Sequence, residues 1–244
     1  MIFSIIIPTY NSKLSIVKCL ESIQSQTFTS YEVIIIDGNS SDNTIDICKK
    51  FASNFPAIQI ISERDNGIYD AMNKGIKLSS GDFLVFLNSG DCFANESSLS
   101  KLVSASAGFD LVYGDLMIKD QEDEWIKKYP DHLNLRYFYF ESIPHPACLI
   151  SKRLFNKVGF YDTTLKIVSD WKFFLISVIK QKCSYRHIDE VISIFDYQGI
   201  SSIGSNRKRI ELERRRVLKE DFVFFYYLYT IYLKLIGKSF YQEI

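Results

Sequence analysis

Residues 3–11 read FSIIIPTYN, and residues 32–44 read EVIIIDGNSSDNT. Each stretch is a short apolar run that stops at polar residues, which is typical of a strand buried on both faces. Two further runs, 58–61 and 83–87, have the same form, and helical patterns separate the four runs. Strands and helices in alternation predict an α/β domain with a mostly parallel central sheet flanked by helices.

Helices are expected between these strands. The first is predicted after Ser12, with Leu14, Val17, Leu20 and Ile23 on its buried face. Others are predicted near residues 42–51 and 68–78. The later predicted elements are a strand at 111–113, helices near 152–158 and 170–180, a strand pair at 185–188 and 191–197, and a charged helix over 207–221.

The composition is that of an ordinary globular protein. Of the 244 residues, 47% are hydrophobic and 24% are charged, and the formal net charge is zero. A disordered or fibrous chain is therefore excluded, and no overall charge favours nucleic acid. The five cysteines have no CxxC spacing, so neither a disulfide framework nor a zinc site is predicted. Since Met1 leads directly into a strand, no secretory signal is expected and the domain is placed in the cytoplasm.

Polar segments follow the four early strands directly, at residues 8–11, 37–42, 63–67 and 88–91. The carboxyl ends of parallel strands meet at one edge of a sheet, where open α/β sheets bind ligands. Asp37 could accept hydrogen bonds from a base or ribose, and Asp91 could offer an oxygen to Mg or Mn bound to a diphosphate. Any one segment alone is more often an ordinary turn, but four at one edge indicate a nucleotide-diphosphate site.

In order and spacing these segments resemble the family 2 glycosyltransferases, which have the GT-A fold. The matching motifs are SIIIPTYN at 4–11, EVIIIDGNSSDNT at 32–44, NG at 66–67 followed by Ala71, Asn73 and Gly75, FLNSGD at 86–91, HPA at 145–147, GFYD at 159–162 and KIVSDW at 166–171. The resemblance reaches about Ser202. It implies a glycosyltransferase domain over 1–205, with a nucleotide-sugar half (1–91) and an acceptor half (92–205).

The resemblance also implies a role for particular residues. Asp170 would be the general base that takes the proton from the acceptor hydroxyl, and Asp91 would hold a divalent Mg or Mn ion. Attack opposite the leaving diphosphate would invert the sugar, and such a base contributes about 10²- to 10⁴-fold in rate. The implied donor-binding residues are Pro8, Thr9, Tyr10, Asn11, Asp37, Arg64, Asn66, Asn73, Asn88 and Gly90.

The metal motif departs from the family pattern. Two or three acidic residues are usual there, whereas residues 88–91 read NSGD and keep a single carboxylate. Magnesium commonly binds through one or two carboxylates plus substrate phosphates, so a single acid is tolerable. Either Asp91 with the donor diphosphate and waters is enough, or the metal is weakly held, or it is dispensable. His145 and Lys166 could contact the acceptor or a diphosphate, or could serve only the structure of their loops.

Within the family, the resemblance is closest to enzymes of bacterial O-antigen, colanic-acid and capsule assembly. It implies transfer of a hexose or N-acetylhexosamine from a UDP-sugar to a lipid-linked (polyprenyl diphosphate) saccharide, as in lipopolysaccharide biosynthesis. A catalytically silent sugar-nucleotide-binding subunit is the main alternative, favoured by the reduced acidic motif and disfavoured by Asp170. A dinucleotide oxidoreductase would need GxGxxG after the first strand, and a sugar nucleotidyltransferase a Gly-rich basic loop. Neither feature is in the sequence.

The expected tail, residues 206–244, joins a basic cluster at 207–219 to an aromatic run at 222–236. The uncharged part of this run ends before Lys234, and it is too short for a bilayer of about 30 Å, which needs about 20 apolar residues. Aromatic and basic side chains together suit peripheral contact with the inner face of the cytoplasmic membrane. A helix packed on the core, or a contact between two chains of a homodimer, fits the pattern equally well.

Overall fold

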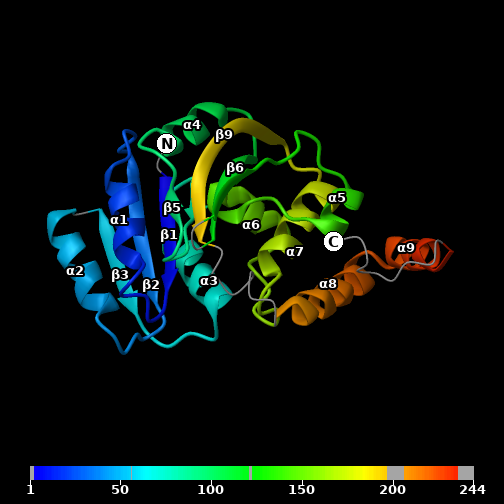
Figure 1. Ribbon diagram of the computed structural model, residues 1–244, viewed down its shortest axis with the longest axis horizontal. Helices are drawn as coiled ribbons and strands as arrows, with labels where there is room; N and C mark the ends of the chain where they lie inside the picture. The colour runs from blue at the N-terminus through cyan, green and yellow to red at the C-terminus, as the bar shows by residue number, and fades with distance from the viewer. Residues whose placement is uncertain (1–2, 56, 121–122, 197–205, 236–244) are drawn as a thin grey trace.

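The computed structural model describes residues 3–55, 57–120, 123–196 and 206–235. Within these residues the strands form a single sheet in the order β3-β2-β1-β4-β8-β6-β9-β5, and β7 pairs with β6. Helices cover the sheet, and two C-terminal helices extend from the end of the molecule opposite α2 (Figure 1). The predicted α/β class is confirmed.

The first half of the sheet is parallel, as predicted. It consists of β1 (Phe3–Thr9), β2 (Tyr31–Asp37), β3 (Ile58–Ser62) and β4 (Phe83–Phe86). All of β1 and β4 is buried, which explains their continuous apolar runs. Helices α1 (Ile16–Gln24), α2 (Thr44–Asn54) and α3 (Ile68–Leu78) connect these strands.

The prediction for Leu14 is wrong. This side chain is 88% exposed, because α1 begins only at Ile16 after a turn in which Ser12 accepts hydrogen bonds from two later backbone N–H groups. The buried face of α1 consists of Ile16, Cys19, Leu20 and Ile23. Leu20 and Ile23 were therefore placed correctly, while the start of the helix lies one turn later than predicted.

The second half of the sheet is mixed. Strand β8 (Cys148–Ser151) runs antiparallel to both β4 and β6 (Leu111–Asp120). The expected pair of strands near the end of the domain is one continuous strand, β9 (Tyr185–Asp196), parallel to β6. Register shifts between β6 and β9 near Asp115 accommodate the polar residues 189–190, which separate the two expected strands. The position Tyr197 of the expected strand lies outside the described residues.

Short elements complete this half. They are β5 (Cys92–Phe93), β7 (Asp123–Lys127), α4 (Ser98–Ala105), α5 (Leu135–Phe140), the 3₁₀ turn η1 (His145–Ala147), α6 (Lys152–Val158), α7 (Ser169–Leu175) and its continuation as the π-helical turn η2 (Ile176–Lys180). Strand β5 pairs antiparallel with β9 and so joins the loop after β4 to the far side of the sheet.

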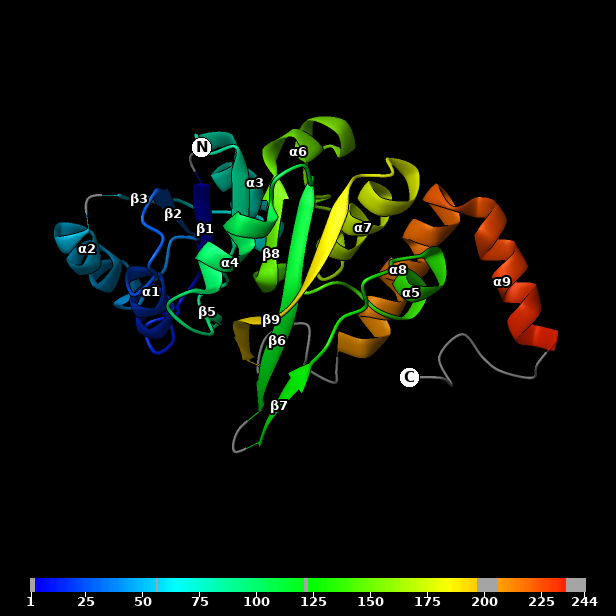
Figure 2. The same cartoon turned by 90° about the horizontal axis from the view of Figure 1, so that it is seen from above.

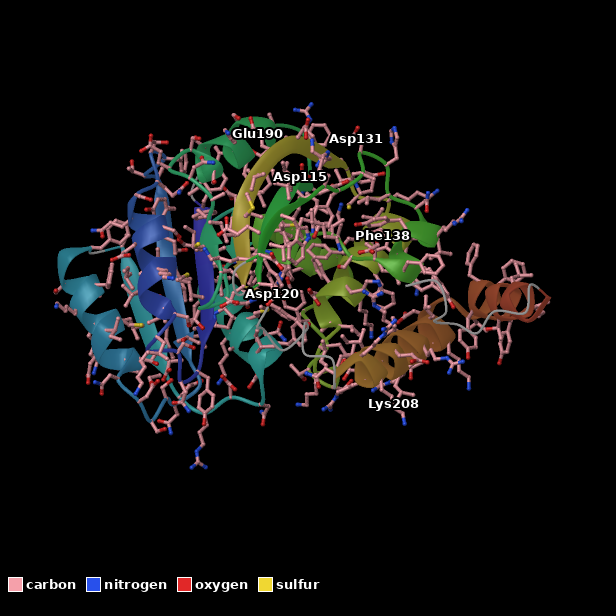
Figure 3. All side chains as sticks on the ribbon, in the orientation of Figure 1. Asp115, Asp120, Asp131, Phe138, Glu190 and Lys208 are labelled. Carbon is pink, nitrogen blue, oxygen red and sulfur yellow. The ribbon has the colours of Figure 1, made fainter. Side chains whose placement is uncertain are left out.

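Two helices form the described part of the expected tail. Helix α8 (Arg207–Asp221) buries Val217 and Leu218 against the domain, and α9 (Val223–Leu235) follows at an angle and projects outward (Figure 2). Figure 3 shows Lys208 on the side of α8 that faces away from the body. Among the described residues, no helix is both long and apolar enough to cross a membrane.

Candidate active site

A cleft of about 910 Å³ lies at the carboxyl edge of the parallel strands. Its lining comes from the ends of β1 and β4, the start of α3, the loop before α7, the end of β9 and part of α8. The predicted site residues that line it are Pro8, Thr9, Tyr10, Asn88, Gly90, Asp91 and Asp170. The structure therefore brings the implied base and the implied metal ligand into one cavity.

The end of β1 presents an exposed ring to this cleft. Tyr10 is 62% exposed, and Gly38 lets it approach the β2 loop, since a Cβ at Gly38 would lie 3.3 Å from the Tyr10 ring. Thr9 Oγ1 is buried and has no hydrogen-bond partner among the described residues. A flat ring beside an unused hydroxyl suits a nucleoside, which offers both a stacking face and polar edges.

Asn11 does not line the cleft. It has a left-handed backbone (φ 48°), which Asn tolerates better than most residues, and its Oδ1 accepts a hydrogen bond from the N–H of Ser41 at 2.9 Å. Its own N–H donates to Ser40 Oγ at 2.8 Å. Asn11 therefore ties the loop after β1 to the loop after β2.

Asp37 is fully buried beneath the same loop. Its Oδ2 accepts hydrogen bonds from the N–H of Ser40 at 2.9 Å and from Ser62 Oγ at 2.7 Å, and its Oδ1 accepts from Ser40 Oγ. The carboxylate thus orders the β2 loop and does not itself line the cleft.

The segment after β3 contributes different residues from those predicted. Arg64 and Asn66 are exposed outside the cleft lining, whereas Asp65 lines it, and its Oδ1 accepts a hydrogen bond from the N–H of Gly67 at 2.9 Å. Lys166 also lines the cleft, and its Nζ donates to the carbonyl oxygen of Asn66 at 3.0 Å. Lys166 therefore places a cation in the cleft and ties the loop before α7 to the segment after β3.

Asn73 has a structural role. Its Nδ2 donates to the carbonyl oxygen of Tyr161 at 2.8 Å, and its Oδ1 accepts from the N–H of the same residue at 3.0 Å. The side chain is buried away from the cleft lining. Its amide joins α3 to the segment before α7.

Asp91 lies almost fully buried at the base of the cleft. Burial raises the pKa of its carboxyl to about 7, although the hydrogen bond from Asn88 Nδ2 at 2.9 Å favours the charged form. The Oδ1 of Asn88 is buried and has no hydrogen-bond partner in the described chain. An acidic oxygen beside an unsatisfied amide oxygen fits a hard divalent cation.

The protein alone offers few metal ligands. In the described ranges no group of three or more His, Cys, Asp or Glu side chains could hold a metal ion. A cation at Asp91 would therefore need oxygens from the donor diphosphate, as is common for Mg²⁺.

Asp170 lies in the first turn of α7, where the helix dipole favours a negative charge. The Tyr69 hydroxyl lies 2.8 Å from its Oδ1 and 2.6 Å from the carbonyl oxygen of Ile167. Burial and the Asp170 charge raise the pKa of Tyr69, so this hydroxyl stays protonated and acts as a donor. One carboxylate oxygen is thereby fixed, and the partly exposed side chain still reaches the cleft.

Helix α8 holds the loop that leads to Asp170. The Glu213 carboxylate accepts hydrogen bonds from three successive backbone N–H groups, those of Lys166, Ile167 and Val168, at 3.0, 3.0 and 3.3 Å. Arg214 lines the cleft and donates from Nη1 to the carbonyl oxygen of Phe140 at 2.8 Å. No pattern in the sequence predicted these contacts, because the resemblance stops before this helix.

His145 and Trp171 belong to the packing around the cleft. His145 Nε2 is 2.9 Å from the Tyr161 hydroxyl and its ring stacks on Phe86, while burial lowers its pKa, so the imidazole is neutral near pH 7. The Trp171 ring is buried, and its Nε1 donates to the carbonyl oxygen of Phe138 at 2.7 Å. Both residues also contribute to the lining of the cleft.

A model of the family described as Glycosyl transferase family 2 matches residues 4–169 of the chain. The chain belongs to this family. The PGL/p-HBAD biosynthesis glycosyltransferase of Mycobacterium bovis is 32% identical to this chain over 206 residues, which cover 82% of this chain and 79% of that one. Glycosyltransferase AglE of Haloferax volcanii is 40% identical over 118 residues, covering 46% of this chain and 38% of AglE. The chain is therefore a glycosyltransferase, and the oxidoreductase and nucleotidyltransferase alternatives are excluded.

Solved structures share the fold of this glycosyltransferase. The S. aureus TarS 1-349 complex with UDP-GlcNAc has a TM-score of 0.70 at 20% identity, over 90% of this chain and 67% of that one. The Pyrobaculum calidifontis mannosyltransferase PcManGT, in complex with GDP-Man and Mn²⁺, has a TM-score of 0.63 at 17% identity, over 87% and 60%. The TarS 1-349 complex with UDP is matched over 60% of its length. These likenesses confirm the GT-A fold.

Proposed function

We propose that this glycosyltransferase moves a hexose or N-acetylhexosamine from a UDP-sugar to a lipid-linked saccharide, with inversion, in the assembly of a bacterial surface polysaccharide. The observation that carries the proposal is the presence of Asp170, from the first turn of α7, and Asp91, from the loop after β4, in one cleft. A base and a set of oxygens that can bind a divalent cation, both facing one cavity, are what displacement at a diphospho-sugar requires.

In the proposed reaction, the acceptor hydroxyl loses its proton to the Asp170 carboxylate as its oxygen forms a bond to the anomeric carbon. The bond from that carbon to the diphosphate oxygen breaks on the opposite face, and UDP leaves with the electron pair. Tyr69 keeps the carboxylate oriented by donating to Oδ1, so the other oxygen is available to the hydroxyl.

Asp91 and the Asn88 carbonyl oxygen would hold the divalent cation, which would supply positive charge to the donor diphosphate. Lys166 lines the cleft nearby and can add a second positive charge to the leaving group. The exposed Tyr10 ring at the end of β1 provides a stacking face for the uracil. The TarS complexes with UDP and UDP-GlcNAc support uridine, whereas PcManGT binds GDP-Man.

The C-terminal helices support a membrane-bound acceptor. Helix α8 has seven Lys or Arg against four Asp or Glu, and the next helix exposes Phe224, Phe225, Leu228 and Ile231. Anionic headgroups attract basic residues by about 1 kcal/mol each near the surface, and apolar side chains insert at the acyl boundary. Since α8 also carries Arg214 into the cleft, a lipid-linked substrate held at the membrane could reach Asp170 directly. Contact with the inner face of the cytoplasmic membrane is part of the proposal, and a homodimer through α9 is its rival.

The proposal is tested by UDP release from a panel of UDP-sugars, with and without Mn²⁺, in the presence of a polyprenyl diphosphate-linked GlcNAc or GalNAc acceptor. Acceptor-dependent release from one donor is the expected result. Release with a GDP-sugar alone would overturn the choice of UDP. Donor binding without turnover, on every acceptor tested, would favour a silent binding protein.

A further inference from the structure

The single acid of the NSGD segment leaves the cation site short of charge. A second carboxylate lies next to it, from the far end of the sheet. Asp196 is the last residue of β9, and it lines the same cleft as Asp91. The two residues are far apart in the sequence but close in space.

Strand pairing brings them together. In the antiparallel pair of β5 and β9, Cys92 lies opposite Ile194 and Phe93 opposite Ser193. Continued by two residues, this register places Gly90 opposite Asp196. The side chains lie accordingly, because a Cβ at Gly90 would lie 3.7 Å from Asp196 Cβ and 3.9 Å from its Oδ2.

A backbone hydrogen bond also joins the two acids, since the Asp196 N–H donates to the Asp91 carboxylate. The other side of β9 is fixed by β6, where Lys119 lies opposite Asp196 and Asp120, labelled in Figure 3, ends the strand. The position of Asp196 is thus set by strands on both sides and not by a loose loop.

The charge of Asp196 acts against ionisation of Asp91, and two neighbouring carboxylates repel each other unless a proton or a cation lies between them. The unsatisfied Oδ1 of Asn88 is a third oxygen at the same spot. We propose that Asp196 is the second carboxylate ligand of the divalent cation held by Asp91. This inference rests on the proposed function, since it needs a sugar-nucleotide site that uses a metal. In this assignment Asp196, which belongs to another strand, takes the place of the second acid that the NSGD segment lacks.

The test measures metal binding directly. Mn²⁺ is titrated into the full chain at a fixed concentration of UDP, and free Mn²⁺ is read from its electron paramagnetic resonance signal, with UDP alone as the blank. The variants are Asp196→Asn, Asp196→Ser and Asp91→Asn. The matched control is Asp189→Asn, on the same strand, whose carboxylate is 75% exposed and pairs with Lys128 on the surface.

Wild type and Asp189→Asn should bind Mn²⁺ equally. Both Asp196 variants should bind it more weakly by about tenfold or more, since even the outer partners of metal ligands are worth about 10- to 100-fold. Circular dichroism checks that each Asp196 variant folds. If one of the two variants is misfolded, the Mn²⁺ affinity of the other still tests the assignment. Wild-type affinity in a folded Asp196 variant overturns the assignment.

Mn²⁺ binding and UDP release together distinguish an error in the role of Asp196 from an error in the proposed function. If Asp196 variants bind Mn²⁺ normally while the wild type still releases UDP with an acceptor, only the role of Asp196 is wrong. If the wild type binds no Mn²⁺ beyond the UDP blank, the assignment is also overturned, and the transfer assay alone then decides the proposed function.

Discussion

Replacing Asp170 by Asn removes the proposed base while keeping the size of the side chain. The amide oxygen can still accept the hydrogen bond that Tyr69 donates at 2.8 Å, so the local geometry should persist. What is lost is the ability to take a proton, and general base catalysis contributes about 10²- to 10⁴-fold. The expected fall in kcat is of that size, equivalent to about 3 to 5 kcal/mol in the activation barrier.

The assay is steady-state UDP release with the best donor and acceptor, combined with UDP titration by calorimetry. The Kd for UDP should stay within about twofold of wild type, because Asp170 acts on the acceptor and not on the nucleotide. Asp162→Asn is the control: this acid sits near α7, pairs with Lys172 at 2.9 Å and does not line the cleft. A kcat for Asp170→Asn within about threefold of that control would refute the role of Asp170 as base.

Three further changes test the structure around the site. Glu213→Gln weakens the charged acceptor of three backbone N–H groups, so unfolding free energy in urea should fall by about 1.5 to 3 kcal/mol, and an unchanged midpoint would mean that these hydrogen bonds add nothing. Gly75→Ala would place a Cβ 2.4 Å from Ile6 Cγ2, so overpacking should cost about 1 to 3 kcal/mol in the same assay; equal stability would show that the core can yield there. Phe224→Ser combined with Leu228→Ser removes exposed apolar surface, so sedimentation with anionic vesicles should be lost while thermal stability is kept. Undiminished sedimentation would rule out α9 as the membrane contact.

The parallel half of the fold was predictable because its strands are buried on both faces. Each apolar run between polar turns can then only be a central strand, and helix α3 was predicted with its observed bounds. The mixed half was harder to predict. Strand β9 is partly exposed and carries Asp189 and Glu190 in its middle, and such residues read as a turn until β6 is seen beside it.

The site was predictable where the chain itself brings residues to the strand ends. Tyr10, Asn88 and Asp91 follow β1 and β4 directly, and the resemblance supplied Asp170. Asn73 was implied by the motif, although its amide is used within the protein.

Other residues in and around the cleft are placed by contacts between segments that are distant in the sequence. Asp196 reaches Asp91 through the β5–β9 pairing, and Glu213 reaches the loop before α7 from a helix that lay beyond the resemblance. Side chains placed by long-range packing leave no local pattern in one sequence. The division of the chain at residue 205 stays a prediction. Glu213 of α8 nevertheless bonds to the loop before α7, which belongs to the acceptor half.

The central claim is that an acceptor oxygen, freed of its proton by Asp170, attacks the anomeric carbon opposite the leaving diphosphate. The most direct measurement is the anomeric configuration of the first product, read by proton NMR from the coupling of the anomeric hydrogen after transfer from an α-linked UDP-sugar. The account predicts a β-linked product, formed together with free UDP. A product that keeps the α configuration would contradict direct displacement and the role of Asp170 in it.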